Sequence, residues 1–172
     1  MGFMGSGKST VGSLLARRIG WSFTDTDRRI EEEGGRAIPR IFREDGEEGF
    51  RRIERRVVRR LLREDGTVIA TGGGWPCRPG RLERVPDGSL SIWLRVSPEA
   101  AFERVSGDGG GSARPLLEVE NPTARIRALI TEREPYYRRA DWWVPTDRGR
   151  PQDIVEHIAG RLVEESARPP GV

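Results

Sequence analysis

The chain begins Met1-Gly2-Phe3-Met4-Gly5-Ser6-Gly7-Lys8-Ser9-Thr10, in which spaced glycines precede a lysine and two hydroxyl residues. Glycine lets the backbone adopt positive φ, so successive N–H groups can turn toward one anion. A helix that opens at Lys8 would add the positive end of its dipole to the same place. The pattern G-x-x-x-x-G-K-[ST] therefore predicts a loop around nucleotide phosphates, with Lys8 on the β- and γ-phosphates and the Ser9 hydroxyl on Mg²⁺.

Lysine usage supports this prediction over a chance glycine turn. Lys8 is the only lysine in the chain, whereas arginine occupies every other cationic position. A compact ammonium and a planar guanidinium bind anions differently, so the exception at Lys8 points to a phosphate site. The residues predicted to bind ATP here are Gly5, Ser6, Gly7, Lys8, Ser9 and Thr10.

Composition excludes several other classes of protein. The 172 residues suit one domain, which we place at 1–166, and the net charge of +3 gives little reason to expect a nucleic-acid partner. One cysteine, Cys77, and one histidine, His157, exclude an internal disulfide and a Cys/His zinc site. No apolar run is long enough for a membrane span, and no signal peptide opens the chain. These features predict a cytoplasmic protein, which we expect to be a monomer.

Hydrophobic periodicity predicts alternating strands and helices. The expected helices cover 8–19, 28–33, a short stretch from 39, 47–64, 98–105, 123–134 and 151–166, and the expected strands cover 21–24, 67–71, 89–96 and 142–145. Such alternation is typical of an α/β fold with a parallel sheet covered on both faces. Ligands of these folds bind beyond the carboxyl ends of the strands, where the phosphate loop, Asp25, Asp27 and the run 72–74 all fall.

One expected element is missing from the sequence. A phosphate loop normally follows a hydrophobic strand, but only Met1 precedes Gly2. Without that strand the loop would be a fraying terminus, and the sheet would lack its central member. We therefore expect the first strand to be truncated, and the native polypeptide to carry about 5–10 further, mostly β-branched residues.

Two short motifs at strand ends are candidates for catalytic or binding roles, and each could instead be an ordinary turn. Asp25 and Asp27 could divide their roles, one serving Mg²⁺ and the other an acceptor hydroxyl, since Mg²⁺ prefers few carboxylates; alone, the pair would be a solvated turn. The run 72–74 offers N–H groups that a ligand can approach closely, or it is simply a flexible turn.

Two further segments carry arginines. Phe50, Ile53 and Glu54 share one helical face, but this pattern alone does not select the adjacent Arg51. The sequence Arg114-Pro115-Leu116-Leu117 follows a glycine-rich segment and looks like a mobile lid with one cation, or else an ordinary surface loop.

Taken together, these residues resemble the shikimate kinase family over essentially the whole chain. The resemblance rests on the phosphate loop at 2–10, Asp25-Thr26-Asp27, Ile41-Phe42, Phe50-Arg51-Arg52-Ile53-Glu54, Gly72-Gly73-Gly74, Arg114-Pro115-Leu116-Leu117, and Tyr137-Arg138 followed by Ala140-Asp141. It implies a P-loop kinase core, a three-layer sandwich with strand order 2-3-1-4-5. It also implies an acceptor-binding region at about 28–64 and a mobile lid at about 107–122. We expect residues 167–172 to form a disordered tail.

The resemblance also implies an activity and a set of roles. The reaction would be transfer of the ATP γ-phosphoryl group to the 3-hydroxyl of shikimate, with Mg²⁺ as cofactor. Asp25 would act on Mg²⁺ through water and Ser9 directly, while Asp27 would hold the acceptor hydroxyls and serve as base. Lys8 and Arg114 would complete the catalytic set, Arg114 arriving with the lid and also binding ATP. The acceptor would be bound by Asp27, Arg51, Arg138, Gly72, Gly73 and Gly74, supported by Phe42, Phe50 and Glu54.

The sequence departs from the family pattern at two places and leaves alternatives open. Trp75 follows Gly74, and its bulk could narrow or reshape the acceptor pocket. The glycine-rich segment before Arg114 is slightly long, so the arginine that contacts adenine is not placed, although Arg104 is a candidate. A related kinase for gluconate or another polyol acid, and a nucleotide-binding regulatory module without turnover, remain alternatives. A nucleic-acid-binding role is the weakest, given the balanced charge.

Overall fold

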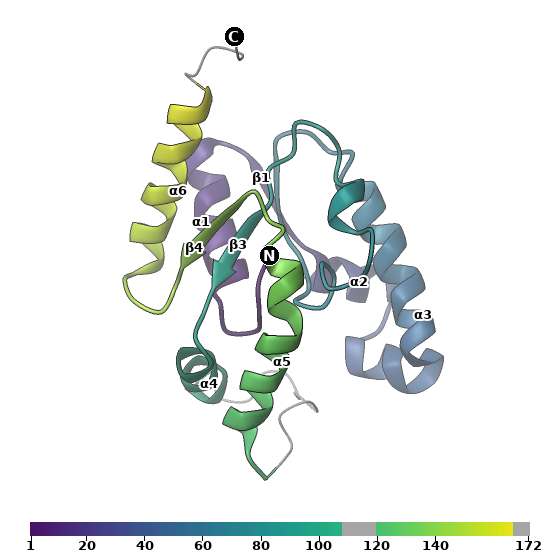
Figure 1. Ribbon diagram of the computed structural model, residues 1–172. Coiled ribbons are helices and arrows are strands. Elements are labelled where there is room, and N and C mark those ends of the chain that lie inside the picture. The colour runs from purple at the N-terminus through teal and green to yellow at the C-terminus, as the bar shows by residue number, and fades with distance from the viewer. Residues whose placement is uncertain (108–119, 167–172) are drawn as a thin grey trace.

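The computed structural model describes residues 1–107 and 120–166. Its elements in chain order are α1 (Lys8–Ile19), β1 (Ser22–Asp25), α2 (Thr26–Gly34), α3 (Ile38–Leu61), β2 (Thr67–Ala70), a 3₁₀ turn (Leu82–Arg84), β3 (Ile92–Arg95), α4 (Pro98–Gly107), α5 (Pro122–Tyr137), β4 (Trp142–Pro145) and α6 (Pro151–Ser166) (Figure 1). The predicted alternation of parallel strands and helices is therefore confirmed. No helix in the described ranges is long and apolar enough to cross a membrane.

The strands pair in parallel as two separate ribbons. β1 pairs with β2 from Ser22↔Thr67 to Asp25↔Ala70, and β3 pairs with β4 from Ile92↔Trp142 to Arg95↔Pro145. In chain order these are the second, third, fourth and fifth strands of the expected order 2-3-1-4-5. A groove lined by residues of both β2 and β3 lies between the two ribbons.

Met1 lies at the edge of this groove and makes two main-chain hydrogen bonds to β3. Its amino group donates to the carbonyl of Ile92 at 2.7 Å, and its carbonyl accepts from the amide of Leu94 at 2.9 Å. The two bonds bracket Trp93 in the pattern of a parallel ladder. The chain therefore enters the phosphate loop in strand geometry.

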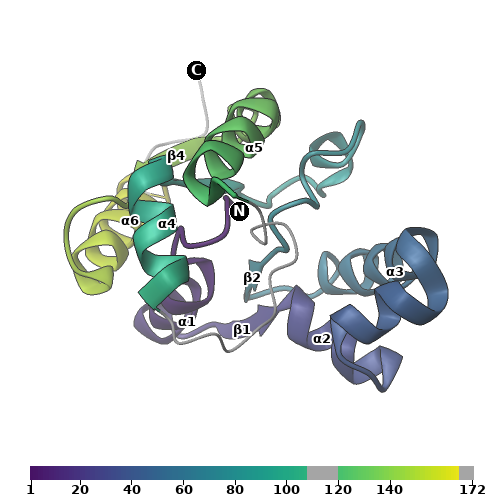
Figure 2. The same cartoon turned by 90° about the horizontal axis from the view of Figure 1, so that it is seen from below.

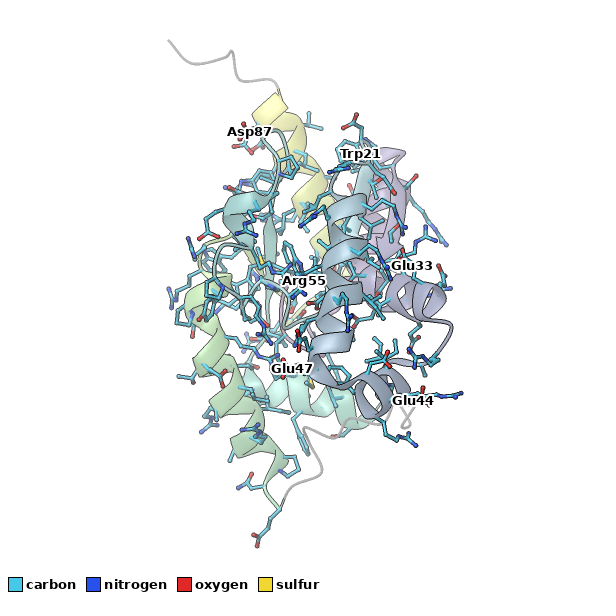
Figure 3. The ribbon with its side chains drawn as sticks, turned by 90° about the vertical axis from the view of Figure 1, so that its right-hand side faces the viewer. Trp21, Glu33, Glu44, Glu47, Arg55 and Asp87 are labelled. Atoms are coloured by element: carbon cyan, nitrogen blue, oxygen red, sulfur yellow. The ribbon has the colours of Figure 1, made fainter. Side chains whose placement is uncertain are left out.

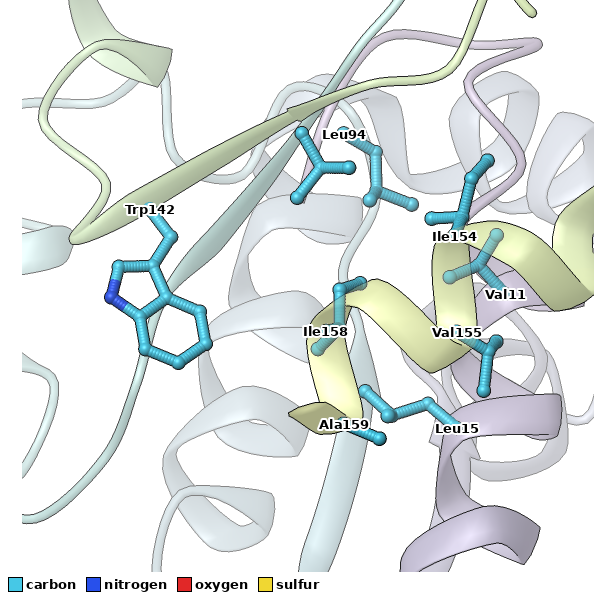
Figure 4. Packing of buried hydrophobic residues seen from close by; sticks show 9 residues of the cluster. Val11, Leu15, Leu94, Trp142, Ile154, Val155, Ile158 and Ala159 are labelled. Carbon is cyan, nitrogen blue, oxygen red and sulfur yellow. The ribbon is translucent and has the colours of Figure 1, made fainter. Parts of the chain in front are cut away.

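Helices cover both faces of the β3–β4 ribbon, because successive strand side chains point to opposite sides. On one face α1 and α6 lie side by side and bury Leu94 and Trp142 (Figure 4). On the other face Trp93 packs against α4 and α5. The sequence thus produces the expected three layers, and the termini of α1 and β3 meet beside the phosphate loop.

The segment predicted to bind the acceptor forms a helical unit of its own. α2 and α3 pack together around Ile30, Ile41 and Leu61, and they stand apart from α4 and α6 (Figure 2). Within α3 the backbone breaks at Gly46, where φ is 69° and ψ is −176°. The sequence predicted two helices in this stretch, and the two arms of α3 on either side of Gly46 correspond to them.

Element ends differ from the predictions in a few places. α3 ends at Leu61 rather than at 64, β3 is shorter than the predicted 89–96, and α5 continues three residues beyond the predicted end at 134. α5 continues through Pro135 although proline has no N–H to donate to the carbonyl four residues earlier. The predicted tail, Arg114 and most of the predicted lid lie outside the described residues.

Candidate active site

The phosphate loop is held closely between β3 and α4. Gly5 and Gly7 have φ of 74° and 85°, values that favour glycine. A Cβ added to Gly2 would lie 2.5 Å from the Leu94 carbonyl oxygen, and one added to Gly5 would lie 2.9 Å from the Ala101 carbonyl oxygen. The loop therefore requires glycine at these positions, both for its turns and for its approach to the neighbouring backbone.

The opening of α1 offers hydrogen-bond donors and positive charge. The helix begins at Lys8 with no side-chain cap and no acidic residue in its first turn, so its first amides stay available to a ligand. The ammonium of Lys8 donates to the carbonyl of Phe3 at 2.9 Å, folded back along the loop. This arrangement suits an anion at the helix N-terminus.

Ser9 and Asp25 meet at the mouth of the loop. The Ser9 hydroxyl donates to Asp25 Oδ2 at 2.6 Å, and Asp25 Oδ1 accepts from the amide of Asp27 at 2.9 Å, capping α2. Residues 1–107 and 120–166 contain no group of three or more His, Cys, Asp or Glu side chains that could hold a metal. A hydroxyl and one carboxylate fit Mg²⁺, which takes its remaining ligands from phosphate oxygens and water.

Asp27 lies next to this pair and against the glycine run. A Cβ on Gly72 would lie 2.8 Å from Asp27 Oδ1, so only glycine leaves room for the carboxylate. Desolvation raises the pKa of Asp27 to about 6; the negative charge of Asp25 also raises it, and Lys8 opposes the shift. The position and pKa suit a group that accepts a proton from a bound hydroxyl.

The run 72–74 is fixed in place and is not a flexible turn. The amide of Gly72 donates to the Thr26 hydroxyl at 2.9 Å, and the carbonyl of Gly73 accepts from the Tyr137 hydroxyl at 2.7 Å. A Cβ on Gly73 would lie 3.1 Å from the Gly2 carbonyl oxygen. The run therefore joins the phosphate loop to the side predicted to bind the acceptor. The roles of Thr26 and Tyr137 in holding it were not predicted.

Arg51 faces the end of the same run. Its guanidinium donates to Glu54 at 2.9 Å and to Glu47 at 3.3 Å, and it lies 5.0 Å above the ring of Phe50. A Cβ on Gly74 would lie 3.7 Å from Arg51 Nη2. Glu47 also pairs with Arg78, which ties the segment after the glycine run to α3.

Arg51 is supported by a buried carboxylate and by a pair of stacked aromatic rings. Glu54 is 2% exposed, and its second oxygen, Oε2, has no partner. Phe42 stacks on Phe50 with 4.5 Å between ring centroids, so the first arm of α3 also reaches the site. Figure 3 shows Glu47 on one side of α3, with Glu33 of α2 on the other.

Arg138 does not join the predicted set in the structure. It pairs with Glu134 at 2.8 Å, its side chain is 66% exposed, and it borders a small groove beside Trp93 and Trp143. The arginine that α5 turns inward is Arg133, whose guanidinium lies 5.6 Å above the ring of Phe3 in the phosphate loop.

Helix geometry explains why Arg133 points inward and Arg138 does not. Arg133 is four residues before Tyr137, so the two side chains lie on one face of α5, whereas Arg138 is turned about 140° away from Arg133. The charge of Arg133 acts on Tyr137 and Cys77, which places it beside the glycine run that Tyr137 holds. Sequence reasoning missed Arg133, although its spacing from Tyr137 was a usable signal.

Two other residues singled out from the sequence are Arg104, which contacts the phosphate loop, and Trp75, which lines the groove. Arg104 donates to the carbonyl of Gly5 at 3.0 Å and to the carbonyl of Thr146, so it braces the phosphate loop against the end of β4. Trp75 is buried and lines the groove between the two ribbons, with Arg81 stacked on its ring at 6.0 Å. Its bulk therefore enters the groove.

Comparison with known proteins agrees with this geometry. The family model for shikimate kinase matches residues 4–163. A shikimate kinase of Symbiobacterium thermophilum is 44% identical over 169 residues, which cover 98% of this chain and 97% of that protein. A shikimate kinase of Moorella thermoacetica is 46% identical over 162 residues, covering 94% of this chain and 91% of that protein.

A solved structure is similarly close. The shikimate kinase from Acinetobacter baumannii in complex with shikimate superposes with a TM-score of 0.88 at 35% identity, covering 97% of this chain and 92% of that one. Both the sequence and the fold are therefore shared over nearly the full length. The chain belongs to the shikimate kinase family of ATP-dependent phosphotransferases.

Proposed function

We propose that the protein transfers the γ-phosphoryl group of ATP to the 3-hydroxyl of shikimate, giving shikimate 3-phosphate and ADP. The observation that supports this proposal is that the phosphate loop and Asp27 both lie against the glycine run 72–74. The Gly2 carbonyl of the phosphate loop lies against Gly73, and Asp27 lies against Gly72. A phosphate held by the loop and a hydroxyl held by Asp27 would therefore be neighbours, as phosphoryl transfer requires.

On the ATP side, positive groups converge where the transferred phosphoryl group spreads its charge. Lys8 would leave the Phe3 carbonyl for the β- and γ-phosphates, and the first amides of α1 would bind phosphate oxygens. Ser9 and Asp25 would hold Mg²⁺, which neutralises phosphate charge when bound. Arg114 is proposed from the family resemblance to add a further cation.

On the acceptor side, a planar carboxylate favours arginine over lysine, because a guanidinium can donate two parallel hydrogen bonds. We assign this role to Arg51 and Arg133. Glu54 holds Arg51 from behind, and Phe42 and Phe50 form the wall next to it. The ring hydroxyls would be bound by Asp27 and the main chain of 72–74.

The two candidate arginines of α5 can be compared directly. Arg133→Lys should raise KM for shikimate by roughly 10-fold or more while changing KM for ATP little, because it removes a bidentate contact to the carboxylate. Arg138→Lys is the matched control and should leave both constants close to those of the parent, since Arg138 pairs with Glu134 on the outer side of the helix. Steady-state kinetics with each substrate varied in turn would measure this.

The reverse ranking would contradict our assignment. If Arg138→Lys weakened shikimate binding and Arg133→Lys did not, the side of α5 that faces the site would be the other one. An equal loss for both substrates in Arg133→Lys would argue for damage to the phosphate loop through Phe3, and against a carboxylate contact.

The choice of acceptor is tested by an ADP-release assay with shikimate, quinate and gluconate. We expect turnover with shikimate to exceed that with the other two. Faster turnover with gluconate would favour the related polyol-acid kinase, and binding of ATP without ADP release would favour the regulatory module. A cytoplasmic location and a monomeric state stay predictions from the sequence.

A further inference from the structure

Arg81 is a cation beside the predicted acceptor pocket to which the proposed function gives no role. Its guanidinium lies over the ring of Trp75, with Cζ 6.0 Å from the ring centroid. Trp75 is buried and directly follows Gly74, and a Cβ on Gly74 would lie 3.7 Å from Arg51 Nη2. Arg81 is therefore attached, through Trp75, to the end of the glycine run that Arg51 faces.

Further arginines gather around Arg81. Of the side chains whose charges act most strongly on it, Glu54 is the only anion, and the others are Arg51, Arg55 and Arg78. Arg55 and Arg78 are exposed, whereas Arg51 and Arg81 are half-buried. The cluster therefore extends from the surface of the protein to the side chain of Arg51.

The carboxylates in this cluster already pair with other members of it. Glu47 pairs with both Arg51 and Arg78, and Glu54 pairs with Arg51 through one oxygen. Figure 3 shows Arg55 on the same side of α3 as Glu47. In the part of the chain that the structure describes, two guanidinium groups of the cluster have no ion pair, those of Arg55 and Arg81.

The surroundings of Arg81 favour a bound anion. Like charges that lie together repel one another, and partial burial removes water that would otherwise screen them. Desolvation is accordingly the main reason that the pKa of Arg81 is lowered. The ring of Trp75 holds the guanidinium in place through a cation–π contact, and a guanidinium offers paired donors to a carboxylate. A carboxylate bound there would offset the repulsion.

We propose that Arg81, assisted by Arg55, captures the carboxylate of the incoming acceptor and passes it to Arg51 and Arg133. This inference rests on the proposed function, because the anion is the acceptor itself. Surface charges of one sign raise the local concentration of an oppositely charged ligand and speed its association. Arg81 is thus a specificity residue that favours acidic acceptors over neutral ones.

The test compares Arg81→Gln with Arg81→Lys in the full chain. Glutamine removes the charge, whereas lysine keeps it. Arg17→Gln is the matched control, because it removes one exposed positive charge at the far end of α1. For each variant, kcat and KM are measured for shikimate, for its uncharged methyl ester and for ATP. The measurements are made at about 10 mM and about 150 mM salt, where the screening length is about 30 Å and about 8 Å.

At low salt, Arg81→Gln should lower kcat/KM for shikimate by roughly 3-fold or more, through KM and with kcat close to that of the parent. The difference should shrink at the higher salt concentration. Arg81→Lys should recover most of the loss, since capture depends on charge. Constants for the methyl ester and for ATP should change little, because the ester is uncharged and ATP binds at the phosphate loop. Arg17→Gln should match the parent.

Three results would overturn the proposal. An equal loss for shikimate and its methyl ester would report a structural change in the pocket. A loss of the same size in Arg17→Gln would report only the net charge of the protein. Parent kinetics in Arg81→Gln would remove the role altogether. If Arg81→Gln does not fold, Arg55→Gln replaces it, since Arg55 is exposed. It should show a smaller loss with the same salt dependence, and no loss at low salt would overturn the proposal equally.

The proposed acceptor and the role of Arg81 fail in different ways. If the parent turned over quinate or gluconate rather than shikimate, the proposed function would be wrong. Both of these acids are carboxylates, so the same comparison with that acid and its neutral ester would still decide the role of Arg81. Normal turnover of shikimate by the parent, with unchanged kinetics in Arg81→Gln, would overturn the role of Arg81 alone.

Discussion

Lys8→Met should lower kcat by roughly 10³-fold while the protein stays folded, because the only ammonium side chain of the molecule is lost from the phosphate loop. Methionine keeps the length and the apolar stem of lysine. The Phe3 carbonyl loses its hydrogen bond from Lys8, but it still accepts from the amide of Ser6 at 3.2 Å, so the loop retains part of its support. A coupled assay of ADP release would measure kcat, and circular dichroism would check the fold.

Arg17→Met is a suitable control, because Arg17 is an exposed cation in the last turn of the same helix. It removes one positive charge from α1 without touching the loop and should leave kcat near the parent value. Near-normal turnover in Lys8→Met would discredit the assignment of the phosphate loop as the ATP site.

Asp27→Asn should lower kcat by roughly 10²-fold or more, if this carboxylate takes the proton of the attacking hydroxyl. The amide has the same shape, so contacts with Gly72 persist and the loss falls on chemistry. Because the pKa of Asp27 is raised, its ionised form is disfavoured in the folded protein. The metal-free variant should therefore unfold at a temperature no lower than the parent above about pH 6, where the parent carries that charge.

Glu32→Gln makes the same chemical change on the exposed side of α2, where Glu32 pairs with Arg29, and should have little effect on turnover. Kinetic constants for both substrates separate the possible roles. An effect of Asp27→Asn confined to KM for ATP would contradict a role as the base.

Local chemistry explains why much of the fold could be predicted from the sequence. α6 begins at Pro151, which suits a first helical turn, and the buried and exposed residues of β4 alternate from Trp142, so both elements have the predicted bounds. The strand-end rule brought Asp27 and Gly72 to the same cleft before any contact was known.

What could not be predicted depends on tertiary contacts. The predicted end of α5 at 134 left Tyr137 and Arg138 outside the helix, so their orientation had no basis. Once α5 continues through Pro135, helix rotation turns Tyr137 and Arg133 inward and Arg138 outward. Likewise, the register of the two parallel strand pairs depends on contacts between distant segments, which no local pattern encodes.

The backbone of Gly46 gives the acceptor pocket a way to change shape without changing its lining. Its φ of 69° and ψ of −176° belong to a region that residues with a Cβ enter only at a cost of about 1–3 kcal/mol. Phe42 and Phe50 lie on opposite sides of this residue yet stack on each other. A substitution at Gly46 would alter the angle between the two arms and thereby the spacing of the rings. Acceptor preference can therefore be changed through a residue outside the predicted acceptor-binding set.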